Sequence, residues 1–256
     1  MKFVRKRVGV LPLAVCMTCW ASSIVAQESV SSEKSQGSDT VPAKPAATKA
    51  PKVELVSPGL YRVADHILLD LKKHEISFPA ACNQVNGLVE YALVHETGKT
   101  HESLFRTKVK PRNLQTTLLL ARVKAAAGFV ENFWKEKPEA MDVSASRLGV
   151  VVSWQGKDGP REVPLESMAT NANTKKTIAS KSFVFNGSRF VGNVFMAEES
   201  GSIIAVYADD TAVINSGDHD ADNDEVWIAR KEAMPPLDLP VTITLKIPAK
   251  KLPSKQ

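Results

Sequence analysis

The sequence predicts an α+β fold: a single, mainly antiparallel, β-rich domain with one or two helices packed on a sheet face. Short runs rich in β-branched and aromatic residues recur from Val53 onward, and several of them alternate apolar with polar residues. Turn-forming pairs such as Thr97-Gly98 and Asn186-Gly187 separate these runs. One long segment, beginning at Pro111, has a helical pattern instead. The composition, 43% hydrophobic and 24% charged, is that of an ordinary globular protein with a real core.

Residues 1–26 have the layout of a secretory signal peptide. Four basic residues precede an uncharged stretch, Val8–Ala26, which ends in small residues. We expect cleavage after Ala26 and a periplasmic or extracellular location. The alternative is an uncleaved anchor, because this stretch is just long enough to span a bilayer, although Pro12 disfavours a span. After cleavage we expect no transmembrane span, because no later stretch is long and apolar enough.

Residues 27–52 are rich in Ser, Lys, Ala and Pro, a composition that predicts a disordered tether before a globular domain at 53–256. The whole chain has 33 basic and 28 acidic residues, a net charge of +5. Loss of the four basic residues of the signal leaves 29 basic residues against 28 acidic ones. Because the mature chain is nearly neutral, we expect no nucleic-acid partner.

The cysteine count excludes whole classes of site. Cys16 and Cys19 leave with the signal, so Cys82 remains alone. A single cysteine makes no intrachain disulfide and no cysteine-ligated metal cluster. We interpret Cys82 as a small apolar packing residue, the alternative being a reactive thiol.

The strand pattern covers most of the domain. Val241–Ile247 is the clearest case, since its alternation puts four apolar residues on one face. The predicted strands, in chain order, are Leu60–Val63, Ile67–Leu71, Glu75–Phe78, Leu88–His95, Ser103–Val109, Leu148–Trp154, Phe183–Phe185, Val194–Met196, Ile203–Tyr207, Val226–Ile228 and Val241–Ile247.

The main helix is predicted to begin at Pro111 and to stop at Gly128. Its apolar stripe includes Leu114 and Leu118 and is wide enough for a helix that packs across a sheet. We expect a second helix over Phe129–Lys137 and a short one over Asp209–Asn215.

Two stretches resemble a known family. They are residues 85–105, with Gly-Lys-Thr-His-Glu-Ser at 98–103, and residues 183–190, with Gly-Ser-Arg-Phe at 187–190, followed by 197–207 and 224–228. Together they resemble the YdjY-domain proteins, exported bacterial proteins frequent in planctomycetes. The resemblance covers about residues 67–247. It implies a domain and an exported location and transfers no mechanism.

The most suggestive polar cluster comprises Lys99, His101, Glu102 and Ser103. In a strand, His101 and Ser103 would share one face, an arrangement that a Ser–His nucleophile requires. Adjacent side chains of this kind seldom align for catalysis. The alternatives are ligand binding, or a structural role in which His101 pins the turn and Glu102 pairs with Lys99 or Arg106.

Glu90 extends this cluster to the preceding strand. We expect the two strands to form an antiparallel hairpin across the Glu96–Lys99 turn, with Glu90 roughly opposite Ser103–Phe105. A carboxylate beside an imidazole is the minimum for a hydrolytic or metal site, and His95 would join His101 at the end of the hairpin.

A second candidate site is the acidic run that ends at Glu225. Its alternating carboxylates suit a hard divalent cation such as calcium, although Asn223 and Ala229 exclude an EF-hand. The alternative is that the run is a solvent-exposed loop that binds no cation. The candidate metal ligands are Asp218, Asp220, Asp222 and Asp224.

Arg189, between Phe185 and Phe190, is the third candidate. Its guanidinium would offer a bidentate fork to a carboxylate, either a ligand's or an internal one such as Glu198 or the acidic loop.

We therefore expect an exported, non-catalytic envelope domain that binds or scaffolds an envelope ligand or protein, steadied by a divalent cation if the acidic run binds one. The alternative is a small hydrolase or metal-dependent enzyme built on Glu90, His101, Glu102 and Ser103. The chain has no P-loop, dinucleotide-binding fingerprint or His-Glu-x-x-His motif, which disfavours the enzyme.

Overall fold

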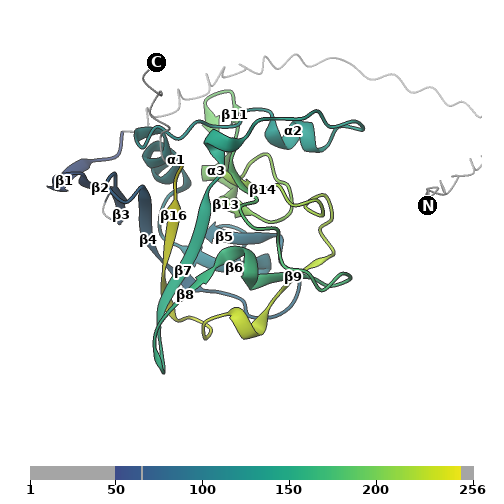
Figure 1. Cartoon of the computed structure of the whole chain (residues 1–256). Coiled ribbons are helices and arrows are strands. Elements are labelled where there is room, and N and C mark those ends of the chain that lie inside the picture. Colours follow the sequence, from purple (N-terminus) through teal and green to yellow (C-terminus); the bar gives the residue numbers. More distant parts are fainter. Residues whose placement is uncertain (1–49, 65, 249–256) are drawn as a thin grey trace, which may run out of the picture. The chain divides into compact units, whose positions relative to one another are not determined.

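The computed structural model describes residues 50–64 and 66–248. The predicted signal peptide and nearly all of the predicted tether lie outside these residues. Within them the chain forms one large sheet with a few short helices (Figure 1), and the predicted α+β class is confirmed. No helix in the described ranges is long and apolar enough to cross a membrane.

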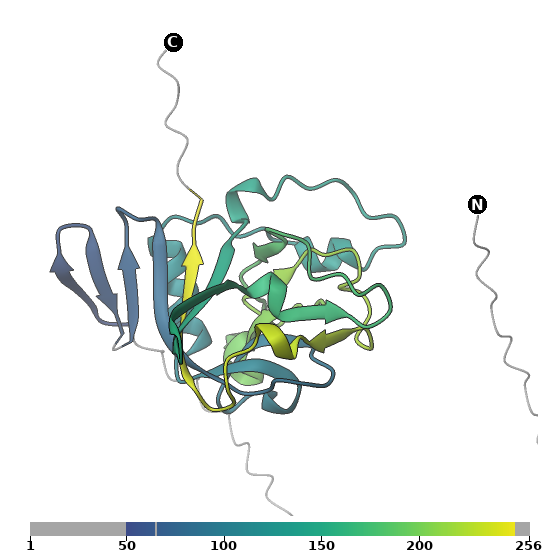
Figure 2. The same ribbon diagram turned by 60° about the horizontal axis from the view of Figure 1, so that its bottom comes forward.

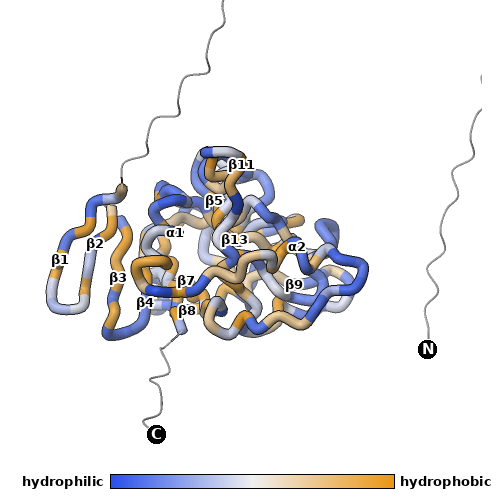
Figure 3. Tube along the Cα trace, turned by 90° about the horizontal axis from the view of Figure 1, so that it is seen from above, coloured by the Kyte–Doolittle hydropathy of each residue, from blue (hydrophilic) through white to orange (hydrophobic). Residues whose placement is uncertain are grey.

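The large sheet is mainly antiparallel, and its two parallel pairs are β5 with β6 and β13 with β14. Its strands, in spatial order, are β1 (Val53–Ser57), β2 (Leu60–Val63), β3 (Ile67–Asp70), β4 (Glu75–Cys82), β6 (Ser103–Thr107), β5 (Tyr91–His95), β13 (Ser202–Ala205), β14 (Ile214–Ser216) and β10 (Phe183–Phe185). A branch leaves this path at β4 through β16 (Pro240–Lys246), β7 (Gly149–Gly156) and β8 (Gly159–Pro164). Figures 2 and 3 show β1 to β3 extending from one side of the body.

Two small sheets complete the strands: β11 (Phe190–Val191) with β12 (Val194–Phe195), and β9 (Ala169–Asn171) with β15 (Trp227–Ala229). The α-helices of the described residues are α1 (Pro111–Leu120), α2 (Phe129–Phe133) and α3 (Met196–Ser200). Single 3₁₀ turns lie at Thr100–Glu102, Ser144–Ser146, Leu165–Met168 and Lys231–Ala233.

Each strand predicted from alternation coincides with a strand of the structure. β16 shows why: Val241, Ile243 and Leu245 are at most 5% exposed and face the core, while Thr242 faces solvent. The sequence pattern missed β1, β8, β9, β11 and β14. Most of these are short or carry Pro and Gly, which weaken a strand signal.

The helix predictions need two corrections. α1 contacts β3, and its predicted stripe residues Leu114 and Leu118 are buried in the core, but the helix ends at Leu120 and not near Gly128. Arg122 has a left-handed φ of 60°, and the Val123 N–H donates to the Leu118 carbonyl, which is the hydrogen bond of a Schellman ending.

The short helix predicted over Asp209–Asn215 is also wrong. Asp209 accepts hydrogen bonds from the backbone N–H and the hydroxyl of Thr211, which folds the segment into a turn. The chain then enters β14 at Ile214. The second predicted helix exists as the shorter α2.

The predicted β5–β6 hairpin is wrong in direction. The strands are parallel, with Tyr91 opposite Ser103 and His95 opposite Thr107. The connection therefore runs back along β5 instead of turning tightly. It passes where Gly98 meets Gly201: a Cβ on Gly201 would lie 2.7 Å from the Gly98 Cα, so the crossing requires glycine there. This return path brings Lys99 beside the start of β5.

Candidate functional site

A hollow of about 250 Å³ lies beside the start of β5, bordered by the residues after β13 and by α2. We call it the carboxylate–aromatic pocket. Its ionisable and aromatic lining consists of Glu90, Tyr91, Lys99, Glu131, Trp134, Tyr207, Asp209 and Asp210.

A chain of hydrogen bonds crosses the pocket. Lys99 Nζ donates to the Tyr91 hydroxyl at 2.8 Å and lies 4.8 Å from the centre of the Tyr91 ring. The Tyr91 hydroxyl donates to Asp209 Oδ2 at 2.9 Å. Burial, and then the charge of Asp209, raise the pKa of Tyr91, so this phenol stays protonated and acts as a donor to the carboxylate.

Asp209 is held in place by hydrogen bonds within the protein. Its backbone N–H donates to Asn215 Oδ1 at 2.8 Å, and its carboxylate accepts the N–H of Thr211 at 2.8 Å. Asn215 is fully buried and donates to Asn186 Oδ1 at 2.9 Å. The buried amide pair thus fixes the turn that presents Asp209.

Glu90 is a partly buried carboxylate of the pocket that has no protein partner in the described ranges. Within the described ranges its carboxylate forms no hydrogen bond or ion pair, while its backbone carbonyl accepts the N–H groups of Val206 and Tyr207. Burial, and then the nearby charge of Glu102, raise the pKa of Glu90, and Lys99 opposes this effect. The site therefore disfavours the charge that Glu90 carries at neutral pH.

Two aromatic side chains complete the pocket. The rings of Trp134 and Tyr207 meet edge to face, with centroids 5.6 Å apart. Trp134 is 47% exposed, which is unusual for the largest apolar side chain. The pocket thus combines four carboxylates, one lysine and a partly exposed aromatic pair.

The structure separates His101 from Ser103. Residues 100–102 form a 3₁₀ turn, so the prediction that the two side chains share a strand face is wrong. Ser103 is buried, and its hydroxyl donates to the Lys99 carbonyl at 2.6 Å. His101 is exposed, and its Nε2 lies 3.6 Å from Glu102 Oε2.

Glu102 pairs with Lys99 at 3.6 Å, which is one of the two pairings expected from the sequence. His95 bonds to the hydroxyl of Thr97 through Nδ1 at 2.8 Å. In the part of the chain that the structure describes, no group of three or more His, Cys, Asp or Glu residues could hold a metal ion.

Two of the four aspartates in the acidic run form hydrogen bonds within the protein. Asp218 Oδ2 accepts the Ala179 N–H at 2.6 Å, and Asp220 Oδ2 accepts from the amide of Asn171 at 2.8 Å. Asp222 and Asp224 are exposed. The hydrogen-bonded carboxylates of Asp218 and Asp220 close the loop against its neighbours.

Arg189 pairs with Asp210, Nε to Oδ2 at 2.8 Å, and not with Glu198 or the acidic run. Glu198 instead accepts the backbone N–H of Arg112 at the start of α1. Arg189 therefore braces one carboxylate of the carboxylate–aromatic pocket.

Sequence reasoning found Glu90 and Lys99 but missed the rest of the pocket. Asp209 and Asp210 follow the predicted strand Ile203–Tyr207 after one residue, and a carboxylate pair near a strand end was the available signal. Tyr91 lies in a buried strand, and the sequence gives no sign that distinguishes it from the apolar residues around it.

The model of the YdjY domain matches residues 67–246, which run from the start of β3 to the end of β16. The chain belongs to the YdjY domain family. No curated protein and no solved structure is significantly similar to it. All residues of the carboxylate–aromatic pocket lie inside the YdjY domain, whereas β1 and β2 precede it.

Proposed function

We propose that this YdjY domain is an exported, non-catalytic binding domain of the bacterial envelope, and that its carboxylate–aromatic pocket binds an organic cation. The observation that carries the proposal is the imbalance of charge in the lining. The lining holds four carboxylates, Glu90, Glu131, Asp209 and Asp210, and one lysine. Arg189 neutralises Asp210, so three carboxylates remain against Lys99, and that of Glu90 has no protein partner in the described ranges.

An ammonium ligand suits this lining for two reasons. A cation near Glu90 offsets the burial and the repulsion from Glu102 that raise the pKa of this carboxyl, so binding is coupled to its ionisation. The partly exposed rings of Trp134 and Tyr207 offer faces that attract a desolvated cation. A neutral ligand would gain neither effect.

The hydrolase alternative has less support. A serine nucleophile needs a free hydroxyl beside a base, yet the Ser103 hydroxyl is buried and donates to a backbone carbonyl. The exported location rests on the signal-peptide pattern of residues 1–26 and on the family resemblance. Mass spectrometry of the protein from an envelope fraction, expected to show a chain that begins at Gln27, tests it.

Binding is tested by calorimetry on residues 27–256 with the diamine cadaverine and the triamine spermidine, and with 1,5-pentanediol as the uncharged control. We expect saturable binding of the amines and none of the diol. Glu90→Gln should weaken binding about tenfold, the loss expected for one partly buried charge contact. Lys99→Gln should strengthen it, because the competing internal cation is gone.

The matched control is Glu162→Gln on β8, which removes an exposed carboxylate outside the pocket and should leave affinity unchanged. Failure of both amines to bind, or binding that Glu90→Gln leaves intact, would refute the proposal.

A further inference from the structure

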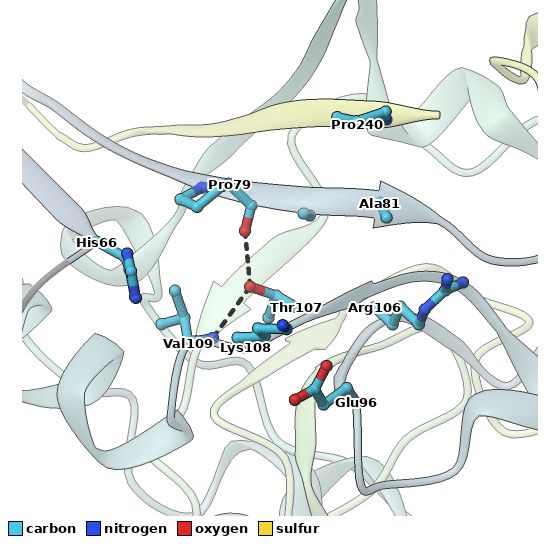
Figure 4. Close-up of a pocket in the computed structure, with 10 residues that line it drawn as sticks. His66, Pro79, Ala81, Glu96, Arg106, Thr107, Lys108, Val109 and Pro240 are labelled. Atoms are coloured by element: carbon cyan, nitrogen blue, oxygen red, sulfur yellow. Dashed lines mark hydrogen bonds between the residues drawn. The ribbon is translucent and has the colours of Figure 1, made fainter. Parts of the chain in front are cut away.

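β4 changes its neighbour halfway along one edge. Residues 75–77 pair with β3, and residues 81–82 pair with β6, while β16 follows the opposite edge throughout. Pro79 lies at the point of change and has no N–H to donate to a neighbouring strand. The two neighbouring strands therefore separate there and leave a notch in the sheet (Figure 4).

This notch, which we call the Pro79 notch, has a volume of about 300 Å³ and an apolar wall. Pro79, Ala81, Val109 and Pro240 supply the wall. The buried hydroxyl of Thr107 donates to the Pro79 carbonyl at 2.7 Å and accepts the Val109 N–H at 3.1 Å. Because the Thr107 hydroxyl makes these hydrogen bonds within the protein, it adds no free donor to the notch.

Basic side chains border this wall. His66 and Lys108 line the notch, and an adjoining hollow of about 200 Å³ shares both of them and adds Lys110. Across residues 50–64 and 66–248, these three side chains form no ion pair or hydrogen bond. Arg106, by contrast, already pairs with Asp238 at 2.7 Å.

Glu96 is the single carboxylate in the lining of the two hollows. The nearby N-terminus of α1 adds no free donor, because Pro111 has no N–H and the Arg112 N–H donates to Glu198. The preference of the notch for an anion or a cation thus depends on the positive charges of Lys108 and Lys110, which the negative charge of Glu96 partly offsets.

We infer that the Pro79 notch binds a single-chain amphipathic anion, with its hydrocarbon part against the proline–alanine wall and its anionic head between Lys108 and Lys110. An apolar wall contributes through the area it removes from water, and unpaired cations at its rim select the sign of the head group. This site shares no lining residue with the carboxylate–aromatic pocket and stands independently of the function proposed for it.

Calorimetric titration of residues 27–256 with monomeric decanoate tests the inference, with decyltrimethylammonium and 1-decanol as probes of similar chain length and different charge. We expect decanoate to bind with one-to-one stoichiometry and the other two to bind at least about fivefold more weakly. The double variant Lys108→Glu/Lys110→Glu should lower decanoate affinity about tenfold, while Glu96→Gln should raise it about twofold.

Lys157→Glu, in the exposed β7–β8 turn, is the matched control and should leave affinity unchanged. Thermal melts of each variant establish that it is folded before its affinity is compared. The inference is overturned if decanoate does not bind, if the cationic or uncharged probe binds equally well, or if the double variant binds as the parent does.

Discussion

At the scale of single residues, Glu90 shows how the site proposed to bind a cation acts against stability. A carboxylate with a raised pKa holds its proton in the folded state at pH values where the unfolded chain has already lost it. The contribution of this group to stability is therefore fully present below pH 4.5, the ordinary value of the carboxyl, and it is lost as the pH rises through the raised pKa. At neutral pH Glu90 is ionised in surroundings that disfavour its charge.

We predict that Glu90→Gln stabilises the protein at pH 7 while it weakens amine binding. The melting temperature should rise by about 1–3 °C at pH 7, and the difference should vanish below about pH 4.5, where both states are protonated. Calorimetric melts from pH 4 to pH 8 measure this. A shift that is the same at every pH would show that packing, and not charge, is responsible.

At the scale of elements, the crossing beside β5 depends on two glycines. Gly201 has a φ of 72°, and a Cβ there would strike the Gly98 backbone, whereas Gly192 has a φ of 58° with open space around it. We predict that Gly201→Ala costs about 3 kcal/mol of unfolding free energy and Gly192→Ala only about 1 kcal/mol. Urea denaturation measures both, and equal losses would mean that the contact is not tight.

The junction between β4 and β6 is a second element with a measurable contribution. Thr107→Val keeps the shape of the side chain but removes the hydroxyl that joins Pro79 to Val109. We predict a loss of about 1–2 kcal/mol in urea denaturation, since buried partners are left unpaired. Thr242→Val, at an exposed position of β16, is the control and should change stability by less than about 0.5 kcal/mol.

At the scale of the whole molecule, Cys82 reports on global opening. The thiol is 0% exposed, and burial together with the charge of Asp238 raises its pKa to about 11. The packing role expected from the sequence agrees with this burial. We predict that an aromatic disulfide reagent reacts with native protein only at the unfolding rate and reacts at once in concentrated urea. Fast reaction of the native protein would reveal a local opening around β4.

The sequence predicted local structure well because alternation is a local signal: β16 and β10 were located to within one residue. Pairing was harder to predict. β5 is buried on both faces, so its residues carry no alternation that reveals its partners, and the short connection to β6 suggested a hairpin. A return path between parallel strands depends on contacts with Gly201, about 100 residues away in the chain.

The same reason explains what was missed at the site. Lys99 and Glu90 belong to one segment and were found together. Tyr91 and Asp209 are joined by a hydrogen bond across 118 positions, and no local pattern indicates that contact. Asp209 also begins a segment whose sequence predicts a helix, whereas its hydrogen bond from Thr211 folds that segment into a turn.

The ladder between β4 and β16 has a consequence for how the chain acquires its structure. It joins Glu75 to Lys246, so this part of the sheet can close only after the chain as far as residue 246 is free to fold. Contacts this distant along a chain form slowly. If the chain passed through a narrow channel starting from its N-terminus, this ladder could not form until residue 246 had emerged.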